Sequence, residues 1–462
     1  MFPSRVYAVP VFPSRVYAVP VFPSPSVIRE NPSAPGRLPR GSNGMLYLPT
    51  AATPCVSRSS DSPRPRRLFG SLLGLVFLVS FGRTAFAPLL IEFQAAFDTG
   101  PAAVGVVASL VWLGTGAVRF PAGYLLTQVS RHRIVVASGV ALAVAAAVTS
   151  LADSVRLLQA GSLLIGLASG VYFAAAIPLL GDLFPDGVGR AVGIHGTSAQ
   201  LAAVVAPTVV VVVLYASSWR AVFWLLAGGS LLVTAGLVVA TRRERIPHTA
   251  AADRDFRAAF GHWRVIGTGI LMLTTAGFVW QGLFNFYVSY LTTAKGIDAT
   301  TASTLLTVTF AAGVPAFWLS GRLVDRLPSV PYVVGLLVAF TAGLAAFTAV
   351  RGLVGIVTVS LLIGYAVHSL FPALDTYVLS SLPTDIRGSV YAVFSGLSLL
   401  VESMGSSTVG VLTEAGYSFD AVFRLFVAGM AVVIVVIAVL SVAGRLPDPK
   451  SGVLRPDGTV DD

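Results

Sequence analysis

The chain has 462 residues, of which 55% are apolar and only 11% carry a charge, and its formal net charge is +10. So large an apolar fraction excludes an ordinary water-soluble protein and predicts a polytopic membrane protein. The basic excess does not indicate nucleic-acid binding, because the arginines stand in short breaks between apolar runs and not along one helical face. The single cysteine, Cys55, excludes a disulfide within the chain.

Residues 1–66 are rich in proline, serine and arginine and contain no apolar stretch as long as a signal-peptide core. We expect this segment to be a disordered tail. The ten residues FPSRVYAVPV occur at Phe2–Val11 and again at Phe12–Val21. Because the repeat has neither helical nor strand-like periodicity, we interpret it as duplicated DNA or as upstream sequence read from a misplaced start, with Met45 as the alternative start, and not as a binding module.

From Leu68 onward, apolar runs of roughly 20 residues follow one another, the length that crosses ~30 Å of hydrocarbon as a helix. Polar breaks between the runs are short. The sequence predicts an all-α membrane protein with twelve transmembrane helices, which lie near 68–90, 101–123, 133–151, 157–179, 191–214, 219–241, 264–291, 302–322, 331–350, 352–374, 388–412 and 419–444.

The arginines also predict which way the spans point. Most of them fall on one side of the predicted membrane, including those around 64–67, 131–133, 242–264, 322–326 and 445. The loops on the opposite side hold few cations, namely Arg156, Arg220, Lys295 and Arg351. Positive charge marks the cytoplasmic side. Both termini and the long internal break are therefore expected to be cytoplasmic.

The chain repeats itself at a nearly constant shift. Gly123 falls on Gly321 at a shift of 198, and SLLIG occurs at 162–166 and again at 360–364. Such internal similarity predicts two pseudo-symmetric six-helix halves, residues 67–241 and 264–445, with a cytoplasmic linker at 242–263 and a cytoplasmic tail at 446–462. A solute path would then run between the halves at mid-membrane.

Two charged breaks occupy equivalent places in the two halves. After the eighth span, Gly321, Leu323, Asp325 and Arg326 spell G-x-L-x-D-R. After the second span, a glycine and two arginines remain, but Thr127 stands in the place of the acid. These breaks resemble the G-x-L-x-D-R-x-G-R-R loop of major facilitator superfamily transporters. With Asp182 as a partner for the arginines rather than a ligand, the resemblance implies a cytoplasmic gate formed by Gly123, Arg131, Arg133, Asp182, Gly321, Asp325 and Arg326.

Other patterns refine the resemblance. Arg156 and Gln159 match the family's R-x-x-Q, whereas the fifth span keeps Pro207 without the flanking glycines typical of drug–proton antiporters. Arg119 stands in an R-x-P-x-G setting that resembles nitrate and nitrite porters, where such an arginine holds the anion. Phe317 occupies the place of their second arginine. The likeness therefore disfavours nitrate and leaves a larger carboxylate open.

Ionisable groups inside the spans are expected to have a partner or a function, because burying charge in hydrocarbon is costly. Arg83 lies thirteen residues after Gly70, about 20 Å into the core. It is either a fixed cation for an anionic solute or the partner of Asp375 or Glu402 in an ion pair, and a proton-coupled cycle could use both in turn. Arg119 lies four residues before a cytoplasmic glycine, so it either snorkels to the interface or binds solute.

Polar groups on the later spans complete the candidate site. Gln281 and Asn285 are four residues apart on the seventh span, beside aromatic residues that offer a stacking surface. His368 and Asp375 share one face of the tenth span and suggest a proton relay, and His195 on the fifth is interpreted as a core group. The solute-binding candidates are Arg83, Arg119, Trp280, Gln281, Asn285 and Tyr287, and the proton-coupling candidates are His368, Asp375 and Glu402.

These features predict a secondary active transporter that moves a small polar, anionic solute by alternating access with proton coupling. No G-x-x-x-x-G-K-[ST] loop, H-E-x-x-H, G-x-S-x-G or paired-cysteine pattern is present, so we expect no metal, no cofactor and no enzyme activity. The expected partners are the solute, a coupling ion and the lipid of the cell membrane, for a monomeric chain. The alternatives are an exporter of drugs or metabolites and a transport-silent solute sensor.

The predicted orientation is testable by thiol labelling. Single cysteines introduced at Ala250 and Thr293, in a chain whose Cys55 is replaced by serine, should differ in their reaction with a membrane-impermeant reagent added outside intact cells. We expect labelling at position 293 only, because the arginine bias places residue 250 inside. Labelling at position 250 alone would mean that the orientation is reversed.

Overall fold

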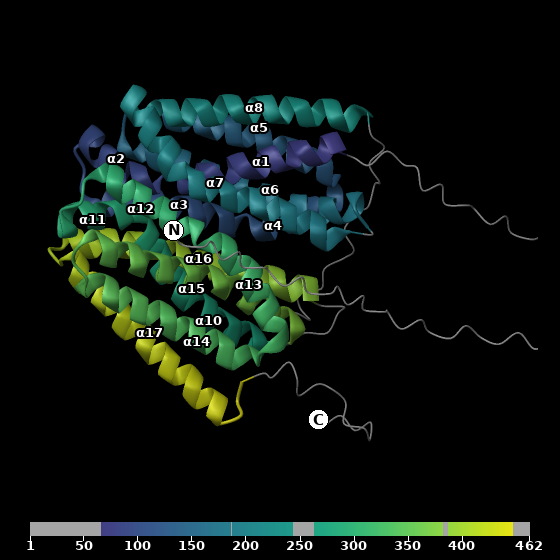
Figure 1. Cartoon of the computed structure of the whole chain (residues 1–462). Helices are drawn as coiled ribbons and strands as arrows, with labels where there is room; N and C mark the ends of the chain where they lie inside the picture. The colour runs from purple at the N-terminus through teal and green to yellow at the C-terminus, as the bar shows by residue number, and fades with distance from the viewer. Residues whose placement is uncertain (1–65, 186, 244–262, 382–386, 447–462) are drawn as a thin grey trace, which may run out of the picture. The chain divides into compact units, whose positions relative to one another are not determined.

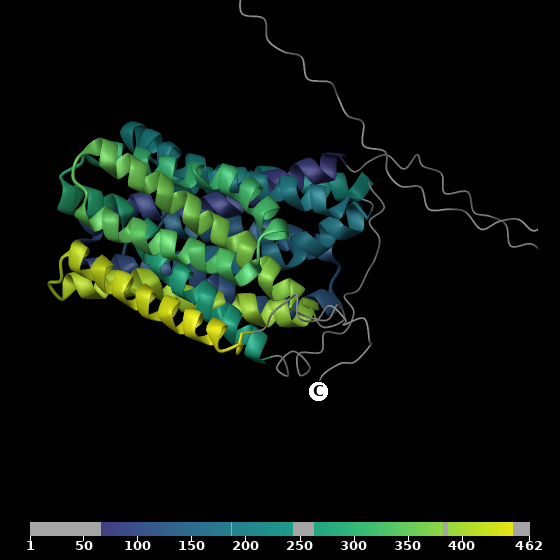
Figure 2. The same cartoon turned by 60° about the horizontal axis from the view of Figure 1, so that its bottom comes forward.

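The computed structural model describes residues 66–185, 187–243, 263–381 and 387–446. Every regular element in these ranges is a helix, and Figures 1 and 2 show the long helices running side by side. The predicted leading tail and the final tail lie almost wholly outside the described residues, as does most of the predicted linker.

The first set of helices corresponds to predicted spans one to six. It consists of α1 (Arg66–Thr84), the short 3-10 helix η1 (Ala87–Leu89), α2 (Leu90–Phe97), α3 (Pro101–Ala117), α4 (Arg119–Gln128), α5 (Arg131–Ser150), α6 (Val155–Leu183), α7 (Val188–Ala216) and α8 (Trp219–Arg243).

The second set corresponds to predicted spans seven to twelve. It consists of α10 (Trp263–Asn285), α11 (Tyr287–Lys295), α12 (Ala299–Ala311), α13 (Gly313–Arg326), α14 (Ser329–Ala349), α15 (Leu353–Ser380), α16 (Arg387–Glu414) and α17 (Phe419–Val442).

Helix length and composition fit a protein that crosses the membrane many times. Among the described residues, ten helical stretches are long and apolar enough to span, and the bent pair α3 and α4 makes eleven. The remaining predicted span, α16, has 28 residues but buries polar side chains at Ser398, Glu402 and Ser406. Its polar face explains its low apolar content and shows that it packs inside the bundle.

Prolines break several spans that the sequence predicts as continuous helices. Helices α1, α3 and α12 end four residues before a proline, at Thr84, Ala117 and Ala311 for Pro88, Pro121 and Pro315. A proline has no N–H to donate, and its ring clashes with the carbonyl four residues earlier. These breaks put Arg83 in the last turn of α1 and Arg119 at the first position of α4.

The two sets of helices meet most intimately along α3 and α16. Gly105 of α3 lies so near the Ser406 carbonyl oxygen that an added Cβ would come within 2.8 Å of it. Beside this contact, Ser407 donates hydrogen bonds to Ser109 Oγ from its backbone N–H at 2.9 Å and from its hydroxyl at 2.7 Å. Small residues therefore let the backbones approach and hydrogen-bond across the interface.

Further contacts between the sets lie toward one end of the bundle. The backbone N–H of Ala102, at the start of α3, donates to Glu414 Oε2 at 2.9 Å. The hydroxyls of Thr208 on α7 and Thr307 on α12 are 3.1 Å apart. We call this the outer end, because the arginine bias predicts that it faces away from the cytoplasm.

Candidate functional site

A cavity of about 520 Å³ lies between the two sets of helices. Helices α1, α3, α6 and α7 line it from one side, and α10, α12, α13, α15 and α16 line it from the other. Its size fits sites that enclose small organic molecules. Most of its wall is apolar or aromatic, so its few polar groups decide what can bind.

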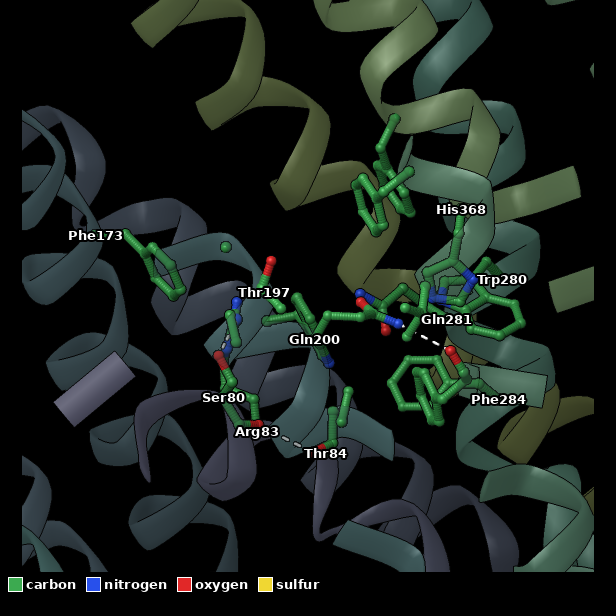
Figure 3. A pocket seen from close by; sticks show the side chains of 18 of the residues that line it. Ser80, Arg83, Thr84, Phe173, Thr197, Gln200, Trp280, Gln281, Phe284 and His368 are labelled. Carbon is green, nitrogen blue, oxygen red and sulfur yellow. Dashed lines mark hydrogen bonds between the residues drawn. The ribbon is translucent and has the colours of Figure 1, made fainter. Parts of the chain in front are cut away.

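The guanidinium group of Arg83 lies over two aromatic rings. Its Cζ lies 4.8 Å from the ring centroid of Trp112 on α3 and 4.7 Å from that of Phe173 on α6. Figure 3 shows Arg83 on the same side of the cavity as Phe173 and Ser80. Cation–π attraction from both rings stabilises the charge, as does the negative end of the α1 dipole at its C-terminal turn.

The donors of Arg83 are mostly unused. Its Nη2 reaches Ser80 Oγ over a long 3.5 Å, and within the described ranges no carboxylate forms an ion pair with it. The buried Nε of Arg83 and the buried Nε1 of Trp112 have no hydrogen-bond partner there. Arg83 lines the cavity, and its ion pair with Asp375 or Glu402 is not formed in this structure.

Aromatic rings form the opposite wall. Trp280 on α10 has ring centroids 5.5 Å from Phe284, 5.7 Å from Phe310 and 5.4 Å from His368. His368 Nδ1 donates to the Gly364 carbonyl at 2.7 Å, which leaves its Nε2 as an acceptor when the ring is neutral. Figure 3 shows Trp280, Phe284 and His368 together across the cavity from Arg83.

Of the two polar residues predicted on the seventh span, one lines the cavity and the other lies behind it. Gln281 lines the cavity. Asn285 stands behind it, where its Nδ2 donates to Ser406 Oγ at 2.9 Å and to the Gln281 carbonyl at 3.0 Å. Tyr287 does not line the cavity: its hydroxyl bonds Ser360 and its ring stacks on another aromatic.

The predicted proton-coupling acids have Arg119 as their electrostatic partner, and neither forms an ion pair with Arg83 in the described residues. Glu402 lines the cavity, is only 4% exposed and has no hydrogen bond or ion pair in the described part of the chain. Asp375 accepts a hydrogen bond of 3.0 Å from the Tyr391 hydroxyl. Arg119 interacts electrostatically with both acids and with Tyr391, which links α4 to α15 and α16. His368 and Asp375 share a helix, but His368 lines the cavity and Asp375 does not.

Comparison with known proteins settles the family. The sequence profile of the Major Facilitator Superfamily matches residues 72–406. The chain belongs to the Major Facilitator Superfamily. It is 25% identical over 386 residues to the "Probable sulfoacetate transporter SauU" of Cupriavidus necator, covering 76% of this chain and 88% of that protein.

Solved transporter structures share the fold. A bacterial homologue of the human lysosomal transporter Spinster, in an inward-facing and occupied conformation, aligns with a TM-score of 0.68 at 16% identity, covering 83% of this chain and 97% of that one. The nucleoside transporter NupG aligns with a TM-score of 0.69 at 14% identity, covering 81% and 99%. At such identities the likeness shows the fold alone, which is the all-α fold of the superfamily.

The superfamily's loop after the second span carries an ion pair in this chain. Arg131, at the start of α5, donates from Nη1 to Asp182 Oδ1 at 2.6 Å and to the Pro178 carbonyl at 3.3 Å. The pair ties α5 to the end of α6. Arg133 and Arg326 are exposed, Gly123 is buried in α4, Gly321 is exposed in α13, and the side chain of Asp325 lies outside the described residues.

His195 is a core residue, as the sequence suggests for a lone histidine. The Tyr172 hydroxyl donates to the Leu72 carbonyl at 2.9 Å and lies 2.8 Å from His195 Nε2. Because that hydroxyl proton is already used by a carbonyl, the Nε2 of His195 is the donor in the second bond. The imidazole also stacks on the Tyr172 ring at 5.8 Å between centroids.

Several residues that line the cavity of this superfamily member were not predicted from the sequence. Trp112 and Phe173 hold Arg83, and Gln200 on α7 donates from Nε2 to the Phe310 carbonyl of α12 at 3.0 Å. A tryptophan and a glutamine inside apolar spans are weak signals by themselves. Which faces of these helices turn toward Arg83 is decided by packing between helices.

The Arg131–Asp182 pair should stabilise the fold. Replacing Asp182 with asparagine should lower the free energy of unfolding by roughly 1.5–3 kcal/mol, the range for a hydrogen bond to a charged group, because both side chains are largely buried, at 15% and 13% exposure. Melting of the purified protein in detergent measures this.

Arg133→Gln is the matched control, since that side chain is exposed. The exchange Arg131→Asp with Asp182→Arg should restore part of the lost stability. An Asp182→Asn protein that melts with the unchanged chain would show that the pair contributes nothing.

Proposed function

We propose that this chain is a secondary active transporter that moves a small organic anion across the cytoplasmic membrane by alternating access. The carrying observation is Arg83, a cation that lines a cavity between the two sets of helices, lies over the rings of Trp112 and Phe173 and has no ion pair within the described residues. Burying a charge without a counter-charge costs free energy, and an anionic solute removes that cost. Carboxylates and sulfonates fit best, because their paired oxygens match the two-pronged donor edge of a guanidinium.

The similarity to SauU supports the same class of solute. Sulfoacetate, the solute in the name of that protein, carries one carboxylate and one sulfonate. Both groups are acceptors of the kind that Arg83 would take. At 25% identity the likeness extends to organic acids as a class and does not select one of them.

Alternating access needs an interface that opens at one end while it closes at the other. In this structure the outer end is held by contacts between the two sets, such as Ala102 with Glu414 and Thr208 with Thr307. At the other end, the Arg131–Asp182 pair joins two helices of the same set. We infer a state closed on the outer side, in which the contacts at the outer end break when the cavity opens outward.

Proton coupling fits Glu402 best among the three predicted groups. It lines the same cavity as Arg83, and its electrostatic partner is Arg119 on the other set of helices. A carboxyl holds its proton less firmly when a cation approaches and more firmly when the cation withdraws. Movement of α4 relative to α16 would therefore bind and release a proton once per cycle. Asp375, held by Tyr391, would complete the cluster.

The first test concerns the anion site. In proteoliposomes containing a panel of aliphatic and aromatic carboxylates and sulfonates, the unchanged chain should accumulate at least one radiolabelled anion. Arg83→Gln should lower its uptake by roughly 10- to 100-fold, since charge-assisted hydrogen bonds are lost.

Arg220→Gln is a matched control for this test. Arg220 also lies over a tryptophan, with its Cζ 4.3 Å from the Trp219 ring, but outside the cavity. Its replacement should leave uptake unchanged. Normal anion uptake by the Arg83→Gln protein would contradict the proposal, and binding without uptake by the unchanged chain would favour a sensor.

The second test concerns coupling. Glu402→Gln should abolish accumulation driven by an inward proton gradient while keeping exchange of internal for external anion, because exchange needs no net proton movement. Exchange and pH-driven uptake are measured in the same vesicles. Full pH-driven accumulation by this variant would rule out Glu402 as the coupling site.

A further inference from the structure

The wall opposite Arg83 indicates which kind of anion the cavity accepts. This inference rests on the anion site proposed above. Trp280, Phe284, Phe310 and His368 surround one another with ring centroids 5.4 to 5.9 Å apart. Phe317 adds a further ring at 6.0 Å from His368. Such edge-to-face groups present ring faces and edges to a flat guest.

The aromatic wall is continuous with the arginine clamp. Trp112, whose ring faces the guanidinium of Arg83, contacts Phe284 edge to face at 6.1 Å and 84°. The cavity thus has a cationic end on the first set of helices and an aromatic end on the second set. Figure 3 shows these two ends on opposite sides, with Gln200 and Gln281 between them.

The volume of the cavity does not suit a two-carbon acid. At about 520 Å³ it lies in the range of roughly 300–1,000 Å³ typical of sites for drug-sized molecules. A solute as small as sulfoacetate would leave the aromatic end without contacts. Since wall atoms without a neighbour lose dispersion energy, a larger apolar body is favoured.

The charges that line the cavity favour one anionic group and not two. Among the lining residues, Arg83 is the cation and Glu402 the carboxylic acid. Among the described residues, the lining offers a second acidic group no further arginine or lysine, and the ionised form of Glu402 would repel it. A cationic aromatic solute is disfavoured in turn, because Arg83 repels it and its unused donors cannot be satisfied by a cation.

We propose that the transported solute is an aryl monoanion, an aromatic ring that carries a single carboxylate or sulfonate. The acid group pairs with the guanidinium group of Arg83, which lines the cavity, and the ring packs against Trp280 and Phe310. The two ends of the solute then contact different sets of helices. Binding at both ends would join the sets around one molecule, which is what a rocking mechanism requires of its substrate.

The proposed solute class is tested by measuring how tightly three acids bind to the purified full-length protein. Phenylacetate, cyclohexylacetate and sulfoacetate are compared by isothermal titration calorimetry in the same detergent. We expect phenylacetate to bind roughly 3- to 10-fold more tightly than cyclohexylacetate, because aromatic pairing adds to simple burial. Sulfoacetate should bind most weakly of the three.

Two variants separate the ends of the site. Trp280→Leu should weaken phenylacetate at least about tenfold, in line with the cost of losing a large aromatic contact in a binding site, and should hardly change sulfoacetate. Trp280→Phe should recover part of the loss, which shows that the ring and not the fold is at issue. Trp224→Leu is the matched control, since Trp224 on α8 is 50% exposed and outside the cavity.

The outcomes distinguish this inference from the proposed function. If sulfoacetate binds more tightly than phenylacetate and needs Arg83 but not Trp280, the aryl class is wrong and the anion transporter stands. If Arg83→Gln leaves phenylacetate binding unchanged, the anion site itself is wrong. Tighter binding of the cation phenethylamine than of phenylacetate would overturn both.

Discussion

The arrangement of the cavity depends on one constraint. The buried guanidinium group of Arg83 is stabilised by neighbours that do not neutralise its charge. Arg83 lies over the rings of Trp112 and Phe173, and the end of α1 supplies a favourable dipole. None of these partners carries a full negative charge. The positive charge therefore stays available at the cavity surface, whereas an ion pair would have cancelled it.

Proline positions explain why the arginines lie where they do. Pro88 and Pro121 end α1 and α3 four residues earlier, so Arg83 and Arg119 both fall beside breaks in the helical hydrogen-bond ladder. The broken spans also let the bundle bend, by 43° between α3 and α4. The same local chemistry thus places both arginines beside interruptions in the helices.

Arg83 and Arg119 have different neighbours. Arg83 lies over aromatic rings, while Arg119 is attracted electrostatically by Glu402 and Asp375. Solute binding and proton exchange can accordingly use different cations. Glu402 belongs to both environments, because it lines the cavity of Arg83 and interacts electrostatically with Arg119. In our proposal this shared acid couples solute binding to proton exchange.

The membrane class, the all-helical architecture, the family and the presence of intramembrane charge at Arg83 follow from the sequence alone. Hydropathy along a helix and the loop motif are local properties of the chain, and they need no knowledge of neighbouring helices. Only the tertiary structure decided which side chains meet. Tyr287 turned toward Ser360 and away from the cavity, Trp112 and Phe173 enclosed Arg83, and Glu402 lay near Arg119. The rotation of each helix about its own axis sets these outcomes, and it depends on packing against helices that are distant in sequence.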